Sequence, residues 1–430
     1  MKKYLVYFAL LFPIMAQSQQ LNLQAAIDTA LKNNFDIRIA KKNSEIGKIN
    51  NTYGVAGGLP TIEGNASDEG ALSDVYQKLN SGTINSEDNG TSNSVDAGIT
   101  ASMTLFNGFR IVATKERLSC LQKQSELLLN EQIQNTIGAV MMQYYDIIRQ
   151  ESYLRIIKNS LDVSQKKLDI INERDKVGMA NAMDILQAQM DVNSAKQDIK
   201  LQQLVVDQDI ASLLLLISAK HYTPYKISDT IVVDSTIILD SISNYLVRNP
   251  QYLSAEQSVK IDQQIIKETA ALRYPSLKMN AGYDYSLTNS SYGTLLTNRI
   301  NGPSAGLTLQ IPIFNGNAYR VKQKTAEFDL ANANLEKESL LTTLKSSAIT
   351  TYLAYSTALK QLQSQKINYQ LSNKLVEVVL NNFQVRQATI LDVKAAQTTY
   401  ENASYLLVNL QYSAKVAEIK LKQLVYNLKY

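Results

Sequence analysis

The stretch Ser94-Val-Asp-Ala-Gly-Ile-Thr-Ala-Ser-Met-Thr-Leu-Phe-Asn-Gly108 alternates apolar and polar residues and ends at an Asn-Gly corner. One face would carry the apolar side chains of Val95, Ala97, Ile99, Ala101, Met103 and Leu105. An apolar residue at every second position is the period of a β-strand with one apolar and one polar face. The stretch therefore predicts a strand in a chain whose other long segments have helical periodicity.

A second copy of this strand lies 208 residues further along the chain, ending at Gly316. Residues 305–316 read Ala-Gly-Leu-Thr-Leu-Gln-Ile-Pro-Ile-Phe-Asn-Gly, with Leu307, Leu309, Ile311 and Ile313 on the equivalent face. Residues 61–67 alternate weakly and residues 277–287 alternate clearly, so each copy has a partner for a hairpin. The polar tract of residues 68–93 is expected to be a long solvent-exposed loop within the first hairpin.

The duplication extends over the whole chain, as repeats at residues 19–219 and 239–430 that are joined by a connector at 220–238. Each repeat has a first helix, a break at Pro60 or Pro275, a β-hairpin, a very long helix, a short turn and a return helix. In the first repeat we expect helices at about 21–54, 108–176 and 182–218 and a hairpin at about 61–107. In the second we expect helices at about 239–271, 316–384 and 390–428 and a hairpin at about 275–315. The fold class is mainly α with membrane β.

The amino end is typical of a secretory signal peptide, predicted for residues 1–18. Lys2 and Lys3 precede an apolar run that ends in Ala16-Gln17-Ser18, a small-residue cleavage site. The run is short for a membrane-spanning helix, although an uncleaved anchor is the alternative. Cys120 is the only cysteine, so no cysteine is available for an internal disulfide or for a lipid anchor at the signal junction.

Composition excludes several classes of function. The chain has 43 basic and 39 acidic residues, a balance too even for a nucleic-acid partner. His221 is the only histidine, so neither a metal cluster nor a Cys-His pair can be assembled within one chain. We therefore expect no cofactor, no metal and no enzymatic activity.

The two hairpins supply four strands, which are too few to close a barrel around a pore. Their apolar faces must be buried against lipid or against other protein segments. One solution is an oligomer whose strands jointly form a membrane barrel. The other is a soluble sandwich that is covered by the helices.

These features together resemble the TolC-like outer membrane efflux proteins. The resemblance rests on the duplication, the breaks at Pro60 and Pro275, the strand ends Leu105-Phe-Asn-Gly108 and Ile313-Phe-Asn-Gly316, and the tip pattern Val177-Gly-Met-Ala-Asn-Ala-Met-Asp184-Ile-Leu-Gln-Ala188. It implies a trimer with a 12-stranded β-barrel on a long α-helical barrel, located in the cell outer membrane and extending into the periplasm. It also implies a periplasmic adaptor protein and an inner-membrane pump of the RND, ABC or a similar class as partners.

The turns between the long helices are the candidate gate, because the family closes its tunnel there. Asn181-x-x-Asp184 and Thr389-x-x-Asp392 both fit a helix-capping pattern, which explains the two acids without any gate. The resemblance adds that Asp392 contributes to an acidic ring in the lumen. Arg386 stands where the first turn has Gly178, so a glycine-dependent turn is in doubt there. Its side chain is a solvated turn charge, an adaptor contact or a latch between helices.

The candidates for lipid-facing strand residues are Val95, Ile99, Met103, Leu105, Leu277, Met279, Tyr283, Leu307, Leu309 and Ile311. The resulting hypothesis is an outer membrane exit duct of a multi-component efflux or type I secretion system, in contact with outer membrane lipid. The alternative is a periplasmic or surface coiled-coil scaffold without a pore.

Overall fold

The computed structural model describes residues 21–219, 225, 227, 229–293 and 295–428, so the predicted signal segment and His221 lie outside the described residues. The chain divides into two compact units. The helical unit comprises Met1–Ala40, Leu129–Pro250 and Leu340–Tyr430. The sheet unit comprises Lys41–Leu128 and Gln251–Ser339.

The long helices and the return helices have the same lengths in the two repeats. The helices are α1 (Leu23–Asn33), α2 (Phe35–Asn50), α3 (Arg110–Lys176), α4 (Ala182–Leu216), α5 (Leu239–Tyr245), the 3₁₀-helix η1 (Leu246–Arg248), α6 (Pro250–Ala271), α7 (Ala318–Gln384) and α8 (Ile390–Leu424). Helices α3 and α7 each have 67 residues, and α4 and α8 each have 35. Among the described residues, no helix combines the length and the apolarity needed to cross a membrane.

The first helix of each repeat is broken by an asparagine, which corrects the single helices predicted for residues 21–54 and 239–271. Asn34 and Asn249 have non-helical ψ angles of 129°. The side-chain amide of Asn34 donates to the carbonyl of Leu216 at 2.8 Å, and that of Asn249 donates to the carbonyl of Leu424 at 2.9 Å. Each asparagine thus satisfies a carbonyl at the end of its repeat's return helix, where no intrahelical donor is available. The described residues of the connector 220–238 form neither helix nor strand.

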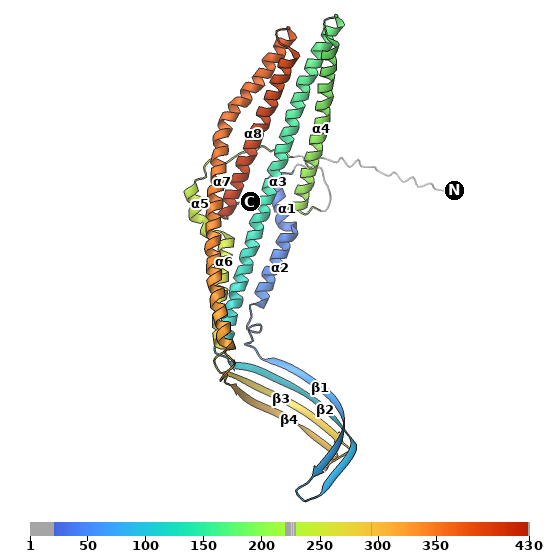
Figure 1. Cartoon of the computed structure of the whole chain (residues 1–430), viewed down its shortest axis with the longest axis vertical. Coiled ribbons are helices and arrows are strands. Elements are labelled where there is room, and N and C mark those ends of the chain that lie inside the picture. The colour runs from blue at the N-terminus through green and yellow to red at the C-terminus, as the bar shows by residue number, and fades with distance from the viewer. Residues whose placement is uncertain (1–20, 220–224, 226, 228, 294, 429–430) are drawn as a thin grey trace, which may run out of the picture. The chain divides into compact units, whose positions relative to one another are not determined.

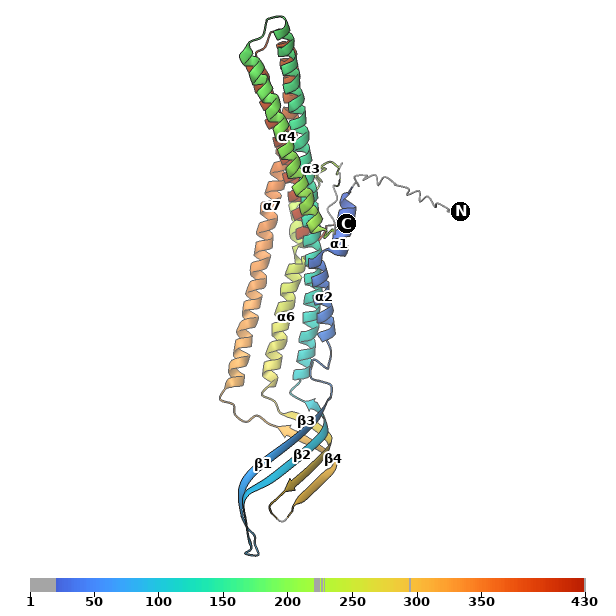
Figure 2. The same ribbon diagram turned by 90° about the vertical axis from the view of Figure 1, so that its right-hand side faces the viewer.

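The sheet unit contains one four-stranded antiparallel sheet. Its strands, in spatial order, are β1 (Thr61–Lys78), β2 (Ile84–Phe106), β3 (Ser276–Ser290) and β4 (Thr297–Gln310). Figures 1 and 2 show the four strands side by side. Strands β2 and β3 come from different repeats, and Ile99 pairs with Tyr283. The duplicated hairpins therefore form one surface.

The polar tract predicted as a loop is part of the strands, so that prediction was wrong. Strand β1 runs on to Lys78 and β2 begins at Ile84, with pairs such as Asp68 with Val95 and Leu72 with Thr91. Side-chain polarity does not prevent pairing, because the ladder is made by backbone groups. Only residues 79–83 remain as the turn.

Two of the predicted lipid-facing residues depart from regular alternation. The β2–β3 register shifts between Thr104 and Phe106, so that Phe106 is opposite Leu277 and Leu105 is the extra residue of a bulge. Strand β4 ends at Gln310, so Ile311 lies outside the sheet. The next residue, Pro312, has no N–H to continue a ladder.

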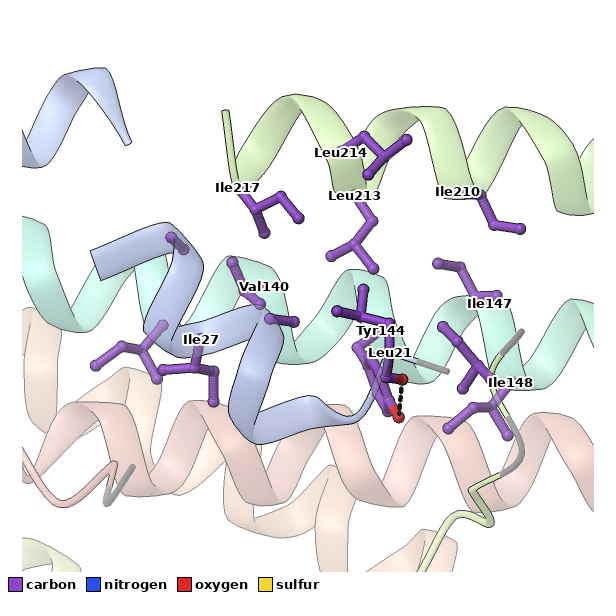
Figure 3. Packing of buried hydrophobic residues seen from close by; sticks show 14 of the residues in the cluster. Leu21, Ile27, Val140, Tyr144, Ile147, Ile148, Ile210, Leu213, Leu214 and Ile217 are labelled. Carbon is purple, nitrogen blue, oxygen red and sulfur yellow. Dashed lines mark hydrogen bonds between the residues drawn. The ribbon is translucent and has the colours of Figure 1, made fainter. Parts of the chain in front are cut away.

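The core of the helical unit joins α1, α3, α4 and the end of α8. Figure 3 shows the side chains of Val140 and Ile147 on α3 facing α4, where Leu213 and Ile217 belong to the same cluster, whereas Tyr144 extends to Leu21. Tyr144 donates a hydrogen bond to Asp229 at 2.5 Å, and its hydroxyl also lies 3.1 Å from the carbonyl of Leu21. Burial, reinforced by the hydrogen bond to Asp229, raises the pKa of Tyr144. The hydroxyl therefore ties the connector and the start of α1 to α3.

The strand-to-helix corner requires glycine at Gly108 for two reasons. Its φ is +67°, and a Cβ there would lie 2.7 Å from the Cβ of Tyr274 and 2.9 Å from the carbonyl of Ala271. Gly316 has a similar φ of +64°, but a Cβ at Gly316 would meet no neighbouring atom within 4 Å. The first corner is therefore in close backbone contact with its neighbours, and the second needs glycine only for its conformation.

Candidate functional site

The two tip turns of the helical unit have the same backbone conformation although their sequences differ. Gly178 has φ +69° and Arg386 has φ +68°. In both turns the following residue closes the helix end: Met179 N donates to Arg174 O at 2.8 Å, and Gln387 N donates to Asn382 O at 2.8 Å. The turn at Arg386 therefore forms without glycine, and the left-handed conformation there costs roughly 1 kcal/mol.

The predicted capping pattern is complete at Thr389 and Asp392, before α8, and partly formed at Asn181 and Asp184, before α4. Thr389 and Asp392 form a reciprocal capping box, in which the Asp392 carboxylate accepts from the Thr389 N–H and hydroxyl at 2.7 Å each. The backbone hydrogen bond from Thr389, followed by that from its hydroxyl, lowers the pKa of Asp392. Asn181 caps α4 by accepting from Met183 N at 3.1 Å, whereas Asp184 stands in the first turn without a reciprocal bond. Within the described residues, no lysine or arginine is paired with either acid, and Asp392 is exposed.

Arg386 contacts the other tip of the same chain. Its guanidinium donates to the sulfur of Met179, which lies in the turn between α3 and α4. Nearby, Arg174 donates to the carbonyl of Phe383 and its guanidinium carbon lies 4.4 Å from the centre of the Phe383 ring. Below these contacts a small apolar core is formed by one residue from each helix, namely Ile171, Ala188, Phe383 and Val393. The two helical hairpins are thus fastened to each other at their tips.

A buried charge cluster that the sequence pattern did not predict lies next to this core. Asp191 on α4 pairs with the fully buried Lys167 of α3 at 2.5 Å and with the half-exposed Lys394 of α8 at 2.8 Å. Burial opposes ionisation of Asp191, but the hydrogen bonds from Lys167 and Lys394 outweigh burial and lower its pKa. The only local signal was that Asp191 follows Asp184 by two helical turns, which says nothing about its partners on α3 and α8.

A polar cavity of about 410 Å³ adjoins the charge cluster between α3, α4 and α8. It is lined by Asp191, Asp198, Glu401 and the buried Gln397, among others. The amide of Gln397 donates to Ser164 Oγ at 3.0 Å, and its carbonyl oxygen has no hydrogen-bond partner. Around this cavity, α3, α4 and α8 are therefore held together by polar contacts. Water can replace the hydrogen bonds when the helices separate, so breaking them costs less free energy than exposing packed apolar surface.

The apolar face of the sheet is exposed in the single chain. Ile99 is 60% exposed, Leu307 66% and Leu309 61%, and Met279 and Tyr283 are also exposed. Paired residues share a face, and the register places Ile99 beside Tyr283, Met103 beside Met279, and Leu277 beside Leu309 on this surface, with Val95 beside Leu287. No second layer among the residues that the structure describes covers the sheet, which contradicts the sandwich covered by helices.

Metal-binding groups are absent from both regions of the described chain. The described residues contain no group of three or more His, Cys, Asp or Glu side chains placed to hold a metal ion. At the tips, Asp392 is engaged in a capping box with Thr389, and Asp191 pairs with Lys167 across two helices.

Comparisons with known proteins agree with this architecture. The family model described as outer membrane efflux protein matches residues 26–219 and 241–425, leaving out the connector. The probable efflux pump outer membrane protein TtgC of Pseudomonas putida is 22% identical over 410 residues, which cover 93% of this chain and 81% of that protein. An uncharacterised protein of Haemophilus influenzae is 22% identical over 292 residues, 66% of this chain and 62% of its own length. The crystal structure of the Campylobacter jejuni CmeC outer membrane channel superposes with a TM-score of 0.80 at 16% identity, covering 94% of this chain and 85% of CmeC.

Proposed function

Because the chain belongs to the outer membrane efflux protein family, we propose that it is the exit duct of a multi-component efflux or secretion system. Three copies would form a 12-stranded barrel in the outer membrane, continued by a tunnel of paired helices in the periplasm. The duct would receive its solutes from an inner-membrane pump through a periplasmic adaptor, and it would carry out no chemistry itself.

The observation that carries this proposal is the incomplete sheet. Its edge strands β1 and β4 have no partner on their outer sides among the described strands, and one of its faces is apolar and exposed. Unpaired strand edges and an uncovered apolar face are unfavourable in water. Pairing of β4 with β1 of the next copy would satisfy the backbone groups, and the membrane would cover the apolar face.

The tips support a gating role. In the proposed trimer, the exposed carboxylates of Asp392, together with those of Asp184, would concentrate negative charge where the helices converge and attract cations. The contacts of Arg174, Arg386 and Lys394 with the neighbouring hairpin would hold the tips closed. Docking of the adaptor and pump would open the duct by replacing these polar contacts.

The proposed function predicts that the purified, folded trimer conducts ions in planar bilayers. We expect a low conductance at rest and a rise when the adaptor is added or when tip contacts are removed. An unheated gel should show an oligomer that heating converts to the monomer. A folded protein that stays monomeric, or that never conducts under any of these conditions, would support the coiled-coil scaffold instead.

The assignment of the sheet faces predicts which single cysteines meet lipid. In a Cys120→Ser background, cysteines replacing Ile99 and Leu307 should react with a membrane-soluble maleimide and resist a charged one, because their side chains share the apolar face. Cysteines replacing Thr100 and Thr308, each the next residue along its strand, should show the opposite preference and lower the conductance when they are modified. If Thr100 and Thr308 were the lipid-exposed pair, the assigned faces would be reversed.

A further inference from the structure

The polar face of the sheet carries a cavity of about 320 Å³ at the junction of strands and helices. Its walls come from β2, β3 and β4, from the start of α3, and from the segments around Tyr274 and Tyr319. Lys278 reaches it from β3, where it pairs with Thr104 on one side and Thr308 on the other. These residues alternate with the apolar ones, so the cavity opens on the face opposite to Met279 and Leu307.

The charge of this cavity is positive and unbalanced. Arg110 and Lys278 are the charged residues that line it, and no Asp or Glu is present among the lining residues. Neither cation forms an ion pair with a carboxylate in the part of the chain that the structure describes. Arg110 is also the first residue of α3, whose N-terminal dipole adds positive potential.

The carboxylates on the polar face of the sheet lie far along the strands from the two cations. The first acid along the polar face is Glu63, opposite Thr100, which is four residues from Thr104 on β2. Four residues of strand correspond to roughly 13 Å. This separation along the strand exceeds the Debye length of about 8 Å at physiological ionic strength, so the carboxylates of the sheet do not neutralise the two cations. On the helical side, Glu268 lies three residues before the lining residue Ala271 and is paired with Arg117.

The walls of the cavity are fixed by backbone contacts. Gly108 brings the start of α3 so close to Tyr274 and Ala271 that a Cβ would collide with both. The Asn107 side chain accepts from Ile111 N at 3.2 Å and so sets the first turn of α3. Lys278 is held by the β-ladder on both sides. The two cations are therefore carried by rigid segments, as a binding site requires.

We propose that this cavity is a luminal anion site, which takes a carboxylate or phosphate group of a solute passing through the duct. The luminal position rests on the proposed function, since it requires the apolar face to meet lipid. Each of three copies would contribute one Arg110 and one Lys278, and together they would form a positive ring at the periplasmic end of the barrel. The duct would then favour anionic solutes at this level, in contrast to the acidic tips.

The test compares the double variant Arg110→Gln/Lys278→Gln with Arg320→Gln/Lys322→Gln. Both remove two positive charges, but Arg320 and Lys322 are exposed on α7 and do not line the cavity. In planar bilayers under a KCl gradient, we expect the chloride-to-potassium permeability ratio to fall at least threefold in the cavity variant and to stay near the wild-type value in the control. Millimolar pyrophosphate should at least halve the wild-type current and leave the cavity variant unblocked.

Calorimetric titration of pyrophosphate onto the same folded, detergent-solubilised proteins separates this inference from the proposed function. We expect at least tenfold weaker binding in the cavity variant than in the wild type and the control. If none of the proteins conducts, the duct and the luminal position are wrong, while the titration still decides whether the cavity binds anions. Equal titrations in all three proteins, or equal shifts of the permeability ratio in both variants, would overturn the anion site.

Discussion

Asp191→Ala is expected to raise the resting conductance of the duct at least tenfold. The substitution leaves the ammonium group of Lys167 buried without its carboxylate and frees Lys394 from the neighbouring hairpin. Breaking a buried ion pair by removing one partner costs about 3–5 kcal/mol. A difference of about 1.4 kcal/mol changes an equilibrium constant tenfold. If even part of the lost free energy destabilises the closed tips relative to the open ones, the open fraction and the conductance rise as expected. The measurements are bilayer conductance and limited proteolysis of the tips.

The pair of Asp191 with Lys394, which links the two hairpins, is called the latch here. Two further variants separate the effect of the latch on gating from its effect on the stability of the tip. Asp191→Ala combined with Lys167→Met removes the uncompensated charge, so protease resistance should recover while conductance stays above that of the wild type. Lys394→Met removes only the ion pair of Lys394 with Asp191 and leaves Lys167 paired. Its conductance should match that of the double variant. This rise should be about fivefold at most, because Lys394 is half-exposed and such pairs contribute about 0–1 kcal/mol. Wild-type conductance and proteolysis in folded Asp191→Ala protein would refute the latch.

The pH dependence of the latch follows from the lowered pKa of Asp191. A carboxyl whose pKa is lower in the folded state contributes stability above its unfolded pKa of about 3.9 and loses it as the pH falls through the folded value. We therefore expect the latch to hold at pH 5 and to weaken only below about pH 4. Opening between pH 5 and 7 would have to come from other groups.

Glu418→Ala is expected to be among the most destabilising substitutions in the helical unit, by about 3–5 kcal/mol. Glu418 is 2% exposed, accepts from the buried Lys415 at 3.0 Å with each carboxylate oxygen, and accepts from Lys422 at 2.8 Å. It also accepts from the N–H of Asp234 at 2.9 Å, which fastens the connector to α8. Alanine would leave a buried ammonium group and a backbone donor without partners.

Thermal unfolding of the detergent-solubilised protein, followed by far-UV circular dichroism, measures this effect. Glu256→Gln is the matched control, because its pair with Lys260 is exposed at 2.9 Å and should contribute less than about 1 kcal/mol. Glu418→Leu combined with Lys415→Met should regain most of the lost stability, since apolar residues can replace a buried pair. If Glu418→Ala had the same unfolding temperature as Glu256→Gln, the contacts of Glu418 with Lys415 and Lys422 would not stabilise the helical unit.

The duplicated strand-to-helix corners show how far local patterns determine this fold. Alternation up to Thr104 predicted the sheet faces, and the absence of proline predicted helices that the structure places at Arg110–Lys176 and Ala318–Gln384. The tip caps were also local, because Thr389 and Asp392 bond to each other within one turn. For such features the partners are within a few residues, so the sequence pattern contains them.

Other features depend on partners far away in the chain. Asn34 breaks a helix because the carbonyl of Leu216 accepts its amide, and Asp68 lies in a strand because β2 supplies its backbone partner. The TolC-like duplication, the alternating segments of the strands and the long helices were determined by the sequence alone, since periodicity and capping act over a few residues. Only the tertiary structure decided the pairing of β2 with β3, the Lys167–Asp191–Lys394 cluster and the cavity of Arg110 and Lys278. In each case residues from distant segments meet across different elements, and the order of residues along the chain does not specify which ones meet.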